Sequence, residues 1–137
     1  MIKFHHFGIL VHNISDFEAK MIYEEKVGQV FDVVQNAYLA LYKNYSESYI
    51  ELIQPVDEGS FTWNFLQKNG LFSYHHICYE VNSLFELNDI QQRHRLLPIL
   101  GPVPAVLFNG KMVSFFYSRN KTIVEFLINN NESPNHI

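Results

Sequence analysis

Tyr74-His75-His76-Ile77-Cys78-Tyr79-Glu80-Val81 repeats a pattern that stands near the start of the chain as Phe4-His5-His6-Phe7-Gly8-Ile9-Leu10-Val11. In both copies two histidines precede an alternating apolar run, which is typical of a half-buried β-strand. A histidine beside a single strand is usually structural. Because the second histidines recur at positions 6 and 76, the pattern predicts a duplicated module whose copies each bring one imidazole to a shared site.

A carboxylate is repeated in the same way, on what we expect to be the last strand of each module. Ile50-Glu51-Leu52-Ile53 and Val124-Glu125-Phe126-Leu127 each place one glutamate inside an apolar strand. Buried carboxylates are costly unless a cation compensates them. Alternation along the first strands leaves His6 and His76 on the face away from the helices and places His5 and His75 on the helix-packed face.

Two imidazoles and two carboxylates are suited to one divalent metal ion. The candidate ligands are therefore His6, Glu51, His76 and Glu125. Nitrogen and oxygen donors without thiolate fit zinc, nickel, cobalt, manganese or iron(II), and the residues do not distinguish among these metals. The alternative is that the four side chains are satisfied polar groups that line a cup without metal.

The bulk composition limits the possible partners. The chain has 137 residues, 47% of them hydrophobic, and a formal net charge of −4 with no basic run, so we expect neither nucleic acid nor a membrane as partner. No apolar run reaches the roughly 18 residues that a membrane-spanning helix needs. Cys78 is the single cysteine, which fits a reducing compartment and predicts a cytoplasmic protein.

The order of the expected elements defines two similar modules in one domain over residues 1–137. The first module covers 1–54, a connector with a short helix covers 55–72, the second module covers 73–128, and a disordered tail covers 129–137. In the first module the patterns predict a strand to Val11, a helix from the capping box at Ser15 to about Gly28, and strands near 30–34, 37–42 and 49–53. In the second they predict a strand over 74–81, a helix from the capping box at Ser83 to about Arg95, a short or edge strand near Ile99, a hairpin turn at Asn109-Gly110, and strands over 112–118 and 122–128.

The chain resembles the vicinal oxygen chelate superfamily, which has the glyoxalase fold, and is most similar there to methylmalonyl-CoA epimerase-like proteins. The resemblance rests on the stretches His6–Val11, Tyr49–Pro55, Phe65–Gly70, His75–Val81 and Ile123–Leu127. It implies an α+β fold in which two βαβββ modules form a strongly curved eight-stranded mixed sheet around a metal-binding cup. It also places His6, Glu51, His76 and Glu125 on the metal-ligand positions.

The same resemblance implies a metal-dependent epimerase or isomerase, similar to methylmalonyl-CoA epimerases or lactoylglutathione lyases, that moves a proton α to a carbonyl or thioester. The expected substrate is a small carbonyl compound or an acyl-CoA, the expected assembly is a homodimer, and the metal stabilises an enolate-like state as a Lewis acid. The characterised epimerases carry a further glutamate on an inner strand, whereas residues 34–41 of this chain contain no acid.

That departure leaves Glu125 and Glu51 as the candidate catalytic groups. Tyr38 and Gln35 are weaker assistants, and Trp63 and Cys78 complete the set of candidate substrate contacts, with ordinary packing as the alternative for both. Two other functions remain open at this point. One is a metal-free small-molecule binding or resistance protein of the same fold, and the other is a non-haem iron dioxygenase, which needs only two histidines and one carboxylate.

Overall fold

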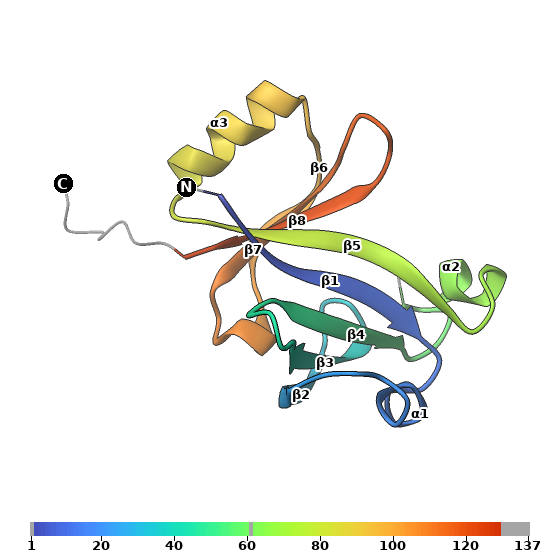
Figure 1. The fold of residues 1–137 in the computed structure, drawn as a ribbon. Helices are drawn as coiled ribbons and strands as arrows, with labels where there is room; N and C mark the ends of the chain where they lie inside the picture. The colour runs from blue at the N-terminus through green and yellow to red at the C-terminus, as the bar shows by residue number, and fades with distance from the viewer. Residues whose placement is uncertain (1, 61, 130–137) are drawn as a thin grey trace. The chain divides into compact units, whose positions relative to one another are not determined.

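The computed structural model describes residues 2–60 and 62–129 (Figure 1). The chain divides into two compact units. The first unit is His6–His75, and the second unit comprises the residues up to His5 together with the chain from His76 onward. The boundaries thus fall inside the two histidine pairs. The predicted disordered tail lies, apart from Asn129, outside the described residues.

Each unit contains one copy of the predicted order of elements, which can be followed from blue to red in Figure 1. The first copy consists of β1 (Lys3–Val11), α1 (Ile14–Glu18), β2 (Glu25–Asp32), β3 (Ala37–Lys43) and β4 (Tyr49–Pro55), followed by the connecting helix α2 (Trp63–Lys68). The second copy consists of β5 (Phe72–Val81), α3 (Leu84–His94), β6 (Leu97–Pro104), the 3-10 helix η1 (Val106–Phe108), β7 (Met112–Tyr117) and β8 (Ile123–Ile128).

The strand pairing is the same in both copies. The first has the order β2-β3-β4-β1 and the second the order β6-β7-β8-β5. The first strand of each copy runs parallel to the last, β1 beside β4 and β5 beside β8, whereas the remaining pairs are antiparallel. The predicted α+β fold with two βαβββ modules and mixed strand pairing is therefore confirmed.

Helix α1 is much shorter than the sequence pattern predicts. Its N-cap is Asn13, whose side chain accepts a hydrogen bond from the backbone N–H of Asp16 at 2.9 Å, so the predicted capping box at Ser15 is wrong. The predicted extension to Gly28 is also wrong, because β2 begins at Glu25, which lies opposite Lys43 of β3. Hydrogen bonding to a neighbouring strand outweighs the helical spacing of the apolar residues here.

Tyr42 of β3 anchors α1 to the sheet of the first unit. Its side chain is fully buried, and its hydroxyl donates a hydrogen bond of 2.7 Å to Glu18, the last residue of α1. The Lys26 ammonium lies 2.7 Å from the same carboxylate. Hydrogen bonds from Lys26 and Tyr42 lower the pKa of Glu18, while burial and the Glu18 carboxylate raise the pKa of Tyr42 well above its usual range.

Helix α3 follows its sequence signals closely. The Ser83 hydroxyl accepts a hydrogen bond from the Glu86 backbone N–H at 3.1 Å, as the predicted capping box requires, and Arg95 ends the helix in the left-handed conformation. The buried face of α3 packs into a core cluster made of Val81, Leu87, Ile90, Leu96, Phe116, Phe126 and Ile128. Burial of each large apolar side chain in such a core contributes about 1.5–3 kcal/mol.

Strand β6 is an edge strand, as its prolines predict. It pairs only with β7 in the strand order, and its register shifts between Pro98 and Leu100 and again between Leu100 and Val103. Asn109 and Gly110 both have positive φ, but they follow η1 in a longer connection and do not form a simple hairpin turn. Among the described residues, no helix is long and apolar enough to cross a membrane.

Candidate metal centre

The first unit brings His6 of β1 beside Glu51 of β4. The two strands are parallel, with His6 opposite Tyr49 and Gly8 opposite Glu51, so His6 and Glu51 share one face. Nε2 of His6 lies 3.8 Å from Oε1 of Glu51, and both side chains are almost completely buried. Gly8, which has no side chain, stands directly opposite Glu51 between the two strands.

The second unit repeats this arrangement with His76 of β5 and Glu125 of β8. Here Cys78 lies opposite Glu125, in the position that Gly8 takes opposite Glu51. Nε2 of His76 lies 2.9 Å from Oε1 of Glu125, and both side chains are again buried. Phe115 of β7 packs its ring edge-on against the His76 imidazole, with ring centroids 5.7 Å apart. This contact holds the orientation of the ring.

Each pair therefore presents one imidazole nitrogen and one carboxylate oxygen on the same face of a buried sheet. A carboxylate in such surroundings must be compensated, either by a proton shared with the imidazole or by a metal cation that replaces the proton. In both pairs the nitrogen nearest the carboxylate is Nε2. Imidazole nitrogen and carboxylate oxygen are the donors that zinc and neighbouring divalent metals accept.

Tyr38 and Gln35 stay predictions as substrate contacts. Tyr38 is paired with Gln54 of β4, which is three residues from Glu51, so Tyr38 occupies the opposite face of the sheet. Its ring packs against Phe31, and its side chain is 42% exposed. Gln35 lies in the turn after β2 and donates a 2.9 Å hydrogen bond to Asp32. The geometry of the strands favours a substrate role for neither residue.

Cys78 and Trp63 stay predictions. Cys78 has a fully buried thiol directly opposite Glu125 in the strand register, where it fills the space beside the carboxylate. Trp63 is the first residue of α2 and is half-buried.

The position of His5 differs from the prediction, which placed this residue on the helix-packed face. Its neighbour Phe4 packs against Tyr79 on the side that α3 covers. The Phe4 and Tyr79 ring centroids are 6.3 Å apart, and Tyr79 borders the core cluster of α3. His5 stacks edge-on against Phe108 at 5.3 Å. A donor nitrogen of His5 lies within 4.8 Å of the Cys78 sulfur, and Cys78 shares the face of Glu125, so the prediction that His5 lies on the helix-packed face is wrong.

Two further side chains were missed from the sequence, Asp32 on the sheet face of Glu51 and Phe115 in contact with His76. Asp32 is buried at the end of β2 and is paired with Ala37 of β3, which in turn is paired with Pro55 of β4. Because Pro55 follows Glu51 by an even number of residues, Asp32 shares the face of Glu51. Its carboxylate accepts hydrogen bonds from the Val34 backbone N–H and the Gln35 amide, both at 2.9 Å, and so closes the turn. Phe115 was missed because its contact with His76 depends on the register of β7, which no sequence signal gives.

Comparison with known proteins agrees with this geometry. The sequence pattern of the glyoxalase/bleomycin resistance protein/dioxygenase superfamily matches residues 5–101. Ethylmalonyl-CoA/methylmalonyl-CoA epimerase of Cereibacter sphaeroides is 28% identical over 95 residues, which cover 69% of this chain and 71% of that protein. The mitochondrial methylmalonyl-CoA epimerase of Dictyostelium discoideum is 27% identical over 127 residues, which cover 90% of this chain and 76% of that protein.

A solved structure supports the fold over the whole chain. The protein concerned is described as a hypothetical protein of Bacillus halodurans, and it is 28% identical to this chain. The match covers 98% of this chain and 99% of that chain, with a TM-score of 0.78. The duplicated βαβββ copies, the repeated histidine and glutamate pairs and the matched sequence pattern lead to one conclusion: the chain belongs to the glyoxalase/bleomycin resistance protein/dioxygenase superfamily.

Proposed function

We propose that this protein is a metal-dependent epimerase or isomerase that moves a proton α to a carbonyl or thioester. The observation that carries the proposal is the equivalence of the two buried pairs. His6 and Glu51 in one unit have the same strand register as His76 and Glu125 in the other, and in both pairs Nε2 faces the carboxylate. Two structural pairs would not need the same register.

We further propose that the two pairs serve one divalent metal ion. All four side chains are buried and are of types that ligate metals. When bound, the metal would supply Lewis-acid stabilisation of the negative charge that develops on the substrate oxygen. The residues leave its identity open among zinc, nickel, cobalt, manganese and iron. Burial of the four groups excludes water, which strengthens their interaction with any cation.

The proposed reaction also needs a group that accepts the proton from the α carbon of the substrate. Proton transfer at a carbon next to a carbonyl needs a base within hydrogen-bond reach. Strand β3, which lies next to Glu51, carries no acidic residue on either face, and its residues beside Glu51 are apolar. We therefore assign proton transfer to Glu125 and Glu51, each of which would act both as a ligand and as a proton acceptor.

Acyl-CoA thioesters are the substrate class that the relatives support. The curated relatives are named as epimerases of methylmalonyl-CoA, and one of them also of ethylmalonyl-CoA. At 27–28% identity these names support the reaction type more strongly than the individual substrate. The proposed substrate of this chain is accordingly a small acyl-CoA or carbonyl compound with an acidic proton on the α carbon.

The test is exchange of the α proton in deuterated water. The protein is stripped with EDTA, reloaded with one divalent metal at a time, and incubated with methylmalonyl-CoA and related acyl-CoA esters, while exchange is followed by NMR. We expect exchange that depends on metal and is lost in His76→Ala, together with about one bound ion per chain. Full exchange in the stripped protein would disprove metal dependence.

The same preparation discriminates the two alternatives. Tight binding of a small molecule that is insensitive to EDTA and is not followed by turnover would identify a metal-free binding protein. Oxygen uptake with catechols after loading with iron(II) would identify a ring-cleaving dioxygenase. The presence of Glu51 as a fourth donor disfavours the dioxygenase, which uses two histidines and one carboxylate and keeps positions open.

A homodimer and a cytoplasmic location belong to this proposal as well. The first is tested by light scattering of the metal-loaded protein, where we expect twice the chain mass of 16.1 kDa. The second is tested by fractionation of cells that express the protein from its own gene.

A further inference from the structure

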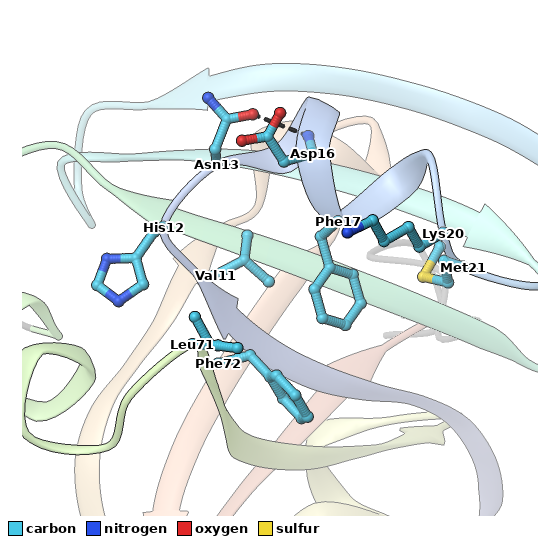
Figure 2. A pocket seen from close by; sticks show the side chains of 9 residues that line it. All are labelled: Val11, His12, Asn13, Asp16, Phe17, Lys20, Met21, Leu71 and Phe72. Atoms are coloured by element: carbon cyan, nitrogen blue, oxygen red, sulfur yellow. Dashed lines mark hydrogen bonds between the residues drawn. The ribbon is translucent and has the colours of Figure 1, made fainter.

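The first unit contains a hollow beside α1, next to the ends of β1 and β5 (Figure 2). Its volume is about 460 Å³, which is within the range of roughly 300–1,000 Å³ for small-molecule pockets. We call its apolar lining the floor and its polar lining the rim. The floor consists of Val11, Phe17, Met21, Leu71 and Phe72, and the rim consists of His12, Asn13, Asp16 and Lys20.

The hollow exists because α1 is too short to cover the sheet. Helix α3 of the second unit has 11 residues and buries Leu87 and Ile90 in the core, whereas α1 has only 5 residues and buries Ile14 alone. Apolar side chains beside α1 are consequently left open to solvent. Leu71 is 85% exposed and Phe72 is 53% exposed, although Phe72 packs edge-on against Phe17 at 5.4 Å.

The rim carries one ammonium group beside this apolar floor. Lys20 and Asp16 have the spacing of an ion pair on a helix, but α1 ends at Glu18 and Lys20 lies beyond it. Among the residues that the structure describes, no ion pair joins Lys20 to a carboxylate. Figure 2 shows Asp16 beside Asn13, whereas the Lys20 side chain extends back toward Phe17.

The remaining rim groups hold the edges of the hollow in place. The Nε2 atom of His12 lies 2.6 Å from the carbonyl oxygen of Gly70 and so ties the end of β1 to the approach to β5. Asn13 caps α1 through the Asp16 backbone N–H. The hollow is thus a formed feature with an apolar floor, two fixed edges and one cationic side chain.

We propose that this hollow binds a small amphipathic carboxylate, with its apolar part on the floor and its carboxylate at the Lys20 ammonium. Burial of the ligand's apolar part on the exposed Leu71 and Phe72 side chains supplies most of the affinity. The exposed ion pair adds less, because such pairs contribute about 0.2–1 kcal/mol, which is about a 1.5- to 5-fold change in affinity. This site is separate in its residues from the proposed metal ligands and does not depend on them.

The test uses octanoate as the probe and octan-1-ol as its uncharged counterpart, titrated into isotope-labelled protein and followed by NMR. We expect octanoate to shift the amide signals of Val11, Phe17 and Phe72. Lys20→Met should weaken octanoate about two- to fivefold and leave octan-1-ol unchanged. Lys68→Met, at an exposed lysine of α2 outside the hollow, is the matched control and should leave both titrations unchanged.

A second variant tests the floor. Leu71→Asn changes a side chain that is 85% exposed, so folding should be retained, and it should weaken both octanoate and octan-1-ol. Equal octanoate affinity in the wild type and Lys20→Met, or signal shifts confined to residues outside the hollow, would overturn the proposal. Floor signals that move with protein concentration alone, and stop doing so in Leu71→Asn, would show that a second copy of the chain covers the hollow instead.

Discussion

If the proposed metal site exists, replacement of Glu125 by glutamine should remove most of the stabilisation that a divalent metal would give to the folded protein. Glutamine has the size of glutamate and keeps one oxygen beside Nε2 of His76, which lies 2.9 Å from the Glu125 carboxylate. It lacks the negative charge that holds a cation. The buried site therefore stays filled, while its affinity for metal falls.

The expected magnitude follows from linkage between binding and folding. Metal at about 100 times its dissociation constant stabilises the folded state by about 2.7 kcal/mol. A chain of 137 residues has an unfolding entropy of about 0.29 kcal/mol/K, at about 2.1 cal/mol/K per residue, so the melting temperature of the wild type should rise by about 9 °C. If glutamine lowers the affinity about 100-fold, the same metal concentration gives about 0.4 kcal/mol, or a rise of about 1–2 °C.

The assay is thermal unfolding with and without metal at a single concentration, after treatment with EDTA. Glu80→Gln is the matched control, because Glu80 lies on β5 on the same face as His76 but is only half-buried and is not one of the four grouped donors. It should show the wild-type rise. A full rise in Glu125→Gln, or no rise in the wild type with any of the candidate metals, would refute the assignment of Glu125 as a ligand.

Three further predictions concern stability. Phe126→Ala should lower the free energy of unfolding by about 3–5 kcal/mol, because the ring is 2% exposed in the α3 core. Phe85→Ala is the control, since this ring is 82% exposed, and it should change the free energy of unfolding by less than about 0.5 kcal/mol. Denaturant unfolding measures both values. Ser83→Ala should cost about 1 kcal/mol in the same assay through loss of the N-cap hydrogen bond, and an unchanged value would contradict the cap. The pKa of Glu18 is lowered, so the stability that its carboxylate contributes is present above the ordinary pKa of 4.5 and is lost as the pH falls through the pKa in the folded protein. The wild type should therefore be more stable than Glu18→Gln at pH 7. A stability difference of the same size in strong acid would contradict this prediction.

The two histidine and glutamate pairs were predictable because each polar residue interrupts a simple alternation. In β4, Ile50 and Leu52 take one face and Glu51 and Ile53 the other, and the structure buries Leu52 in the core beside α1. A single polar residue in such a strand therefore indicates which residues share its face of the sheet. The partner strands could also be inferred, since the repeat of the whole pattern limits which strand each histidine can accompany.

Strand β3 shows where this reasoning fails. Its sequence Ala37-Tyr38-Leu39-Ala40-Leu41-Tyr42-Lys43 is apolar or aromatic at six successive positions, so neither face can be recognised from alternation. Tyr38 was expected to assist the glutamates, and only the register with Gln54 shows that its side chain lies on the face opposite Glu51. The prediction of where α1 ends fails for a related reason. Apolar residues after Glu18 keep helical spacing, and only the pairing of Glu25 with Lys43 shows that the chain has already become a strand.

The structure also limits which residue of the first unit could act as the base in the proposed reaction. The sequence shows no acid in residues 34–41, and the register shows that the β3 side chains on the face of Glu51 are the buried Ala37, Leu39 and Leu41 and, at the end of the strand, Lys43, which is paired with Glu24. A polar group there would have to be compensated in an apolar layer. Asp32 shares that face, but both of its carboxylate oxygens accept hydrogen bonds from the following turn. In the proposed reaction, Glu51 is therefore the residue of the first unit to which we assign the proton on this side, so that the proposed ligand and the proposed base are the same residue.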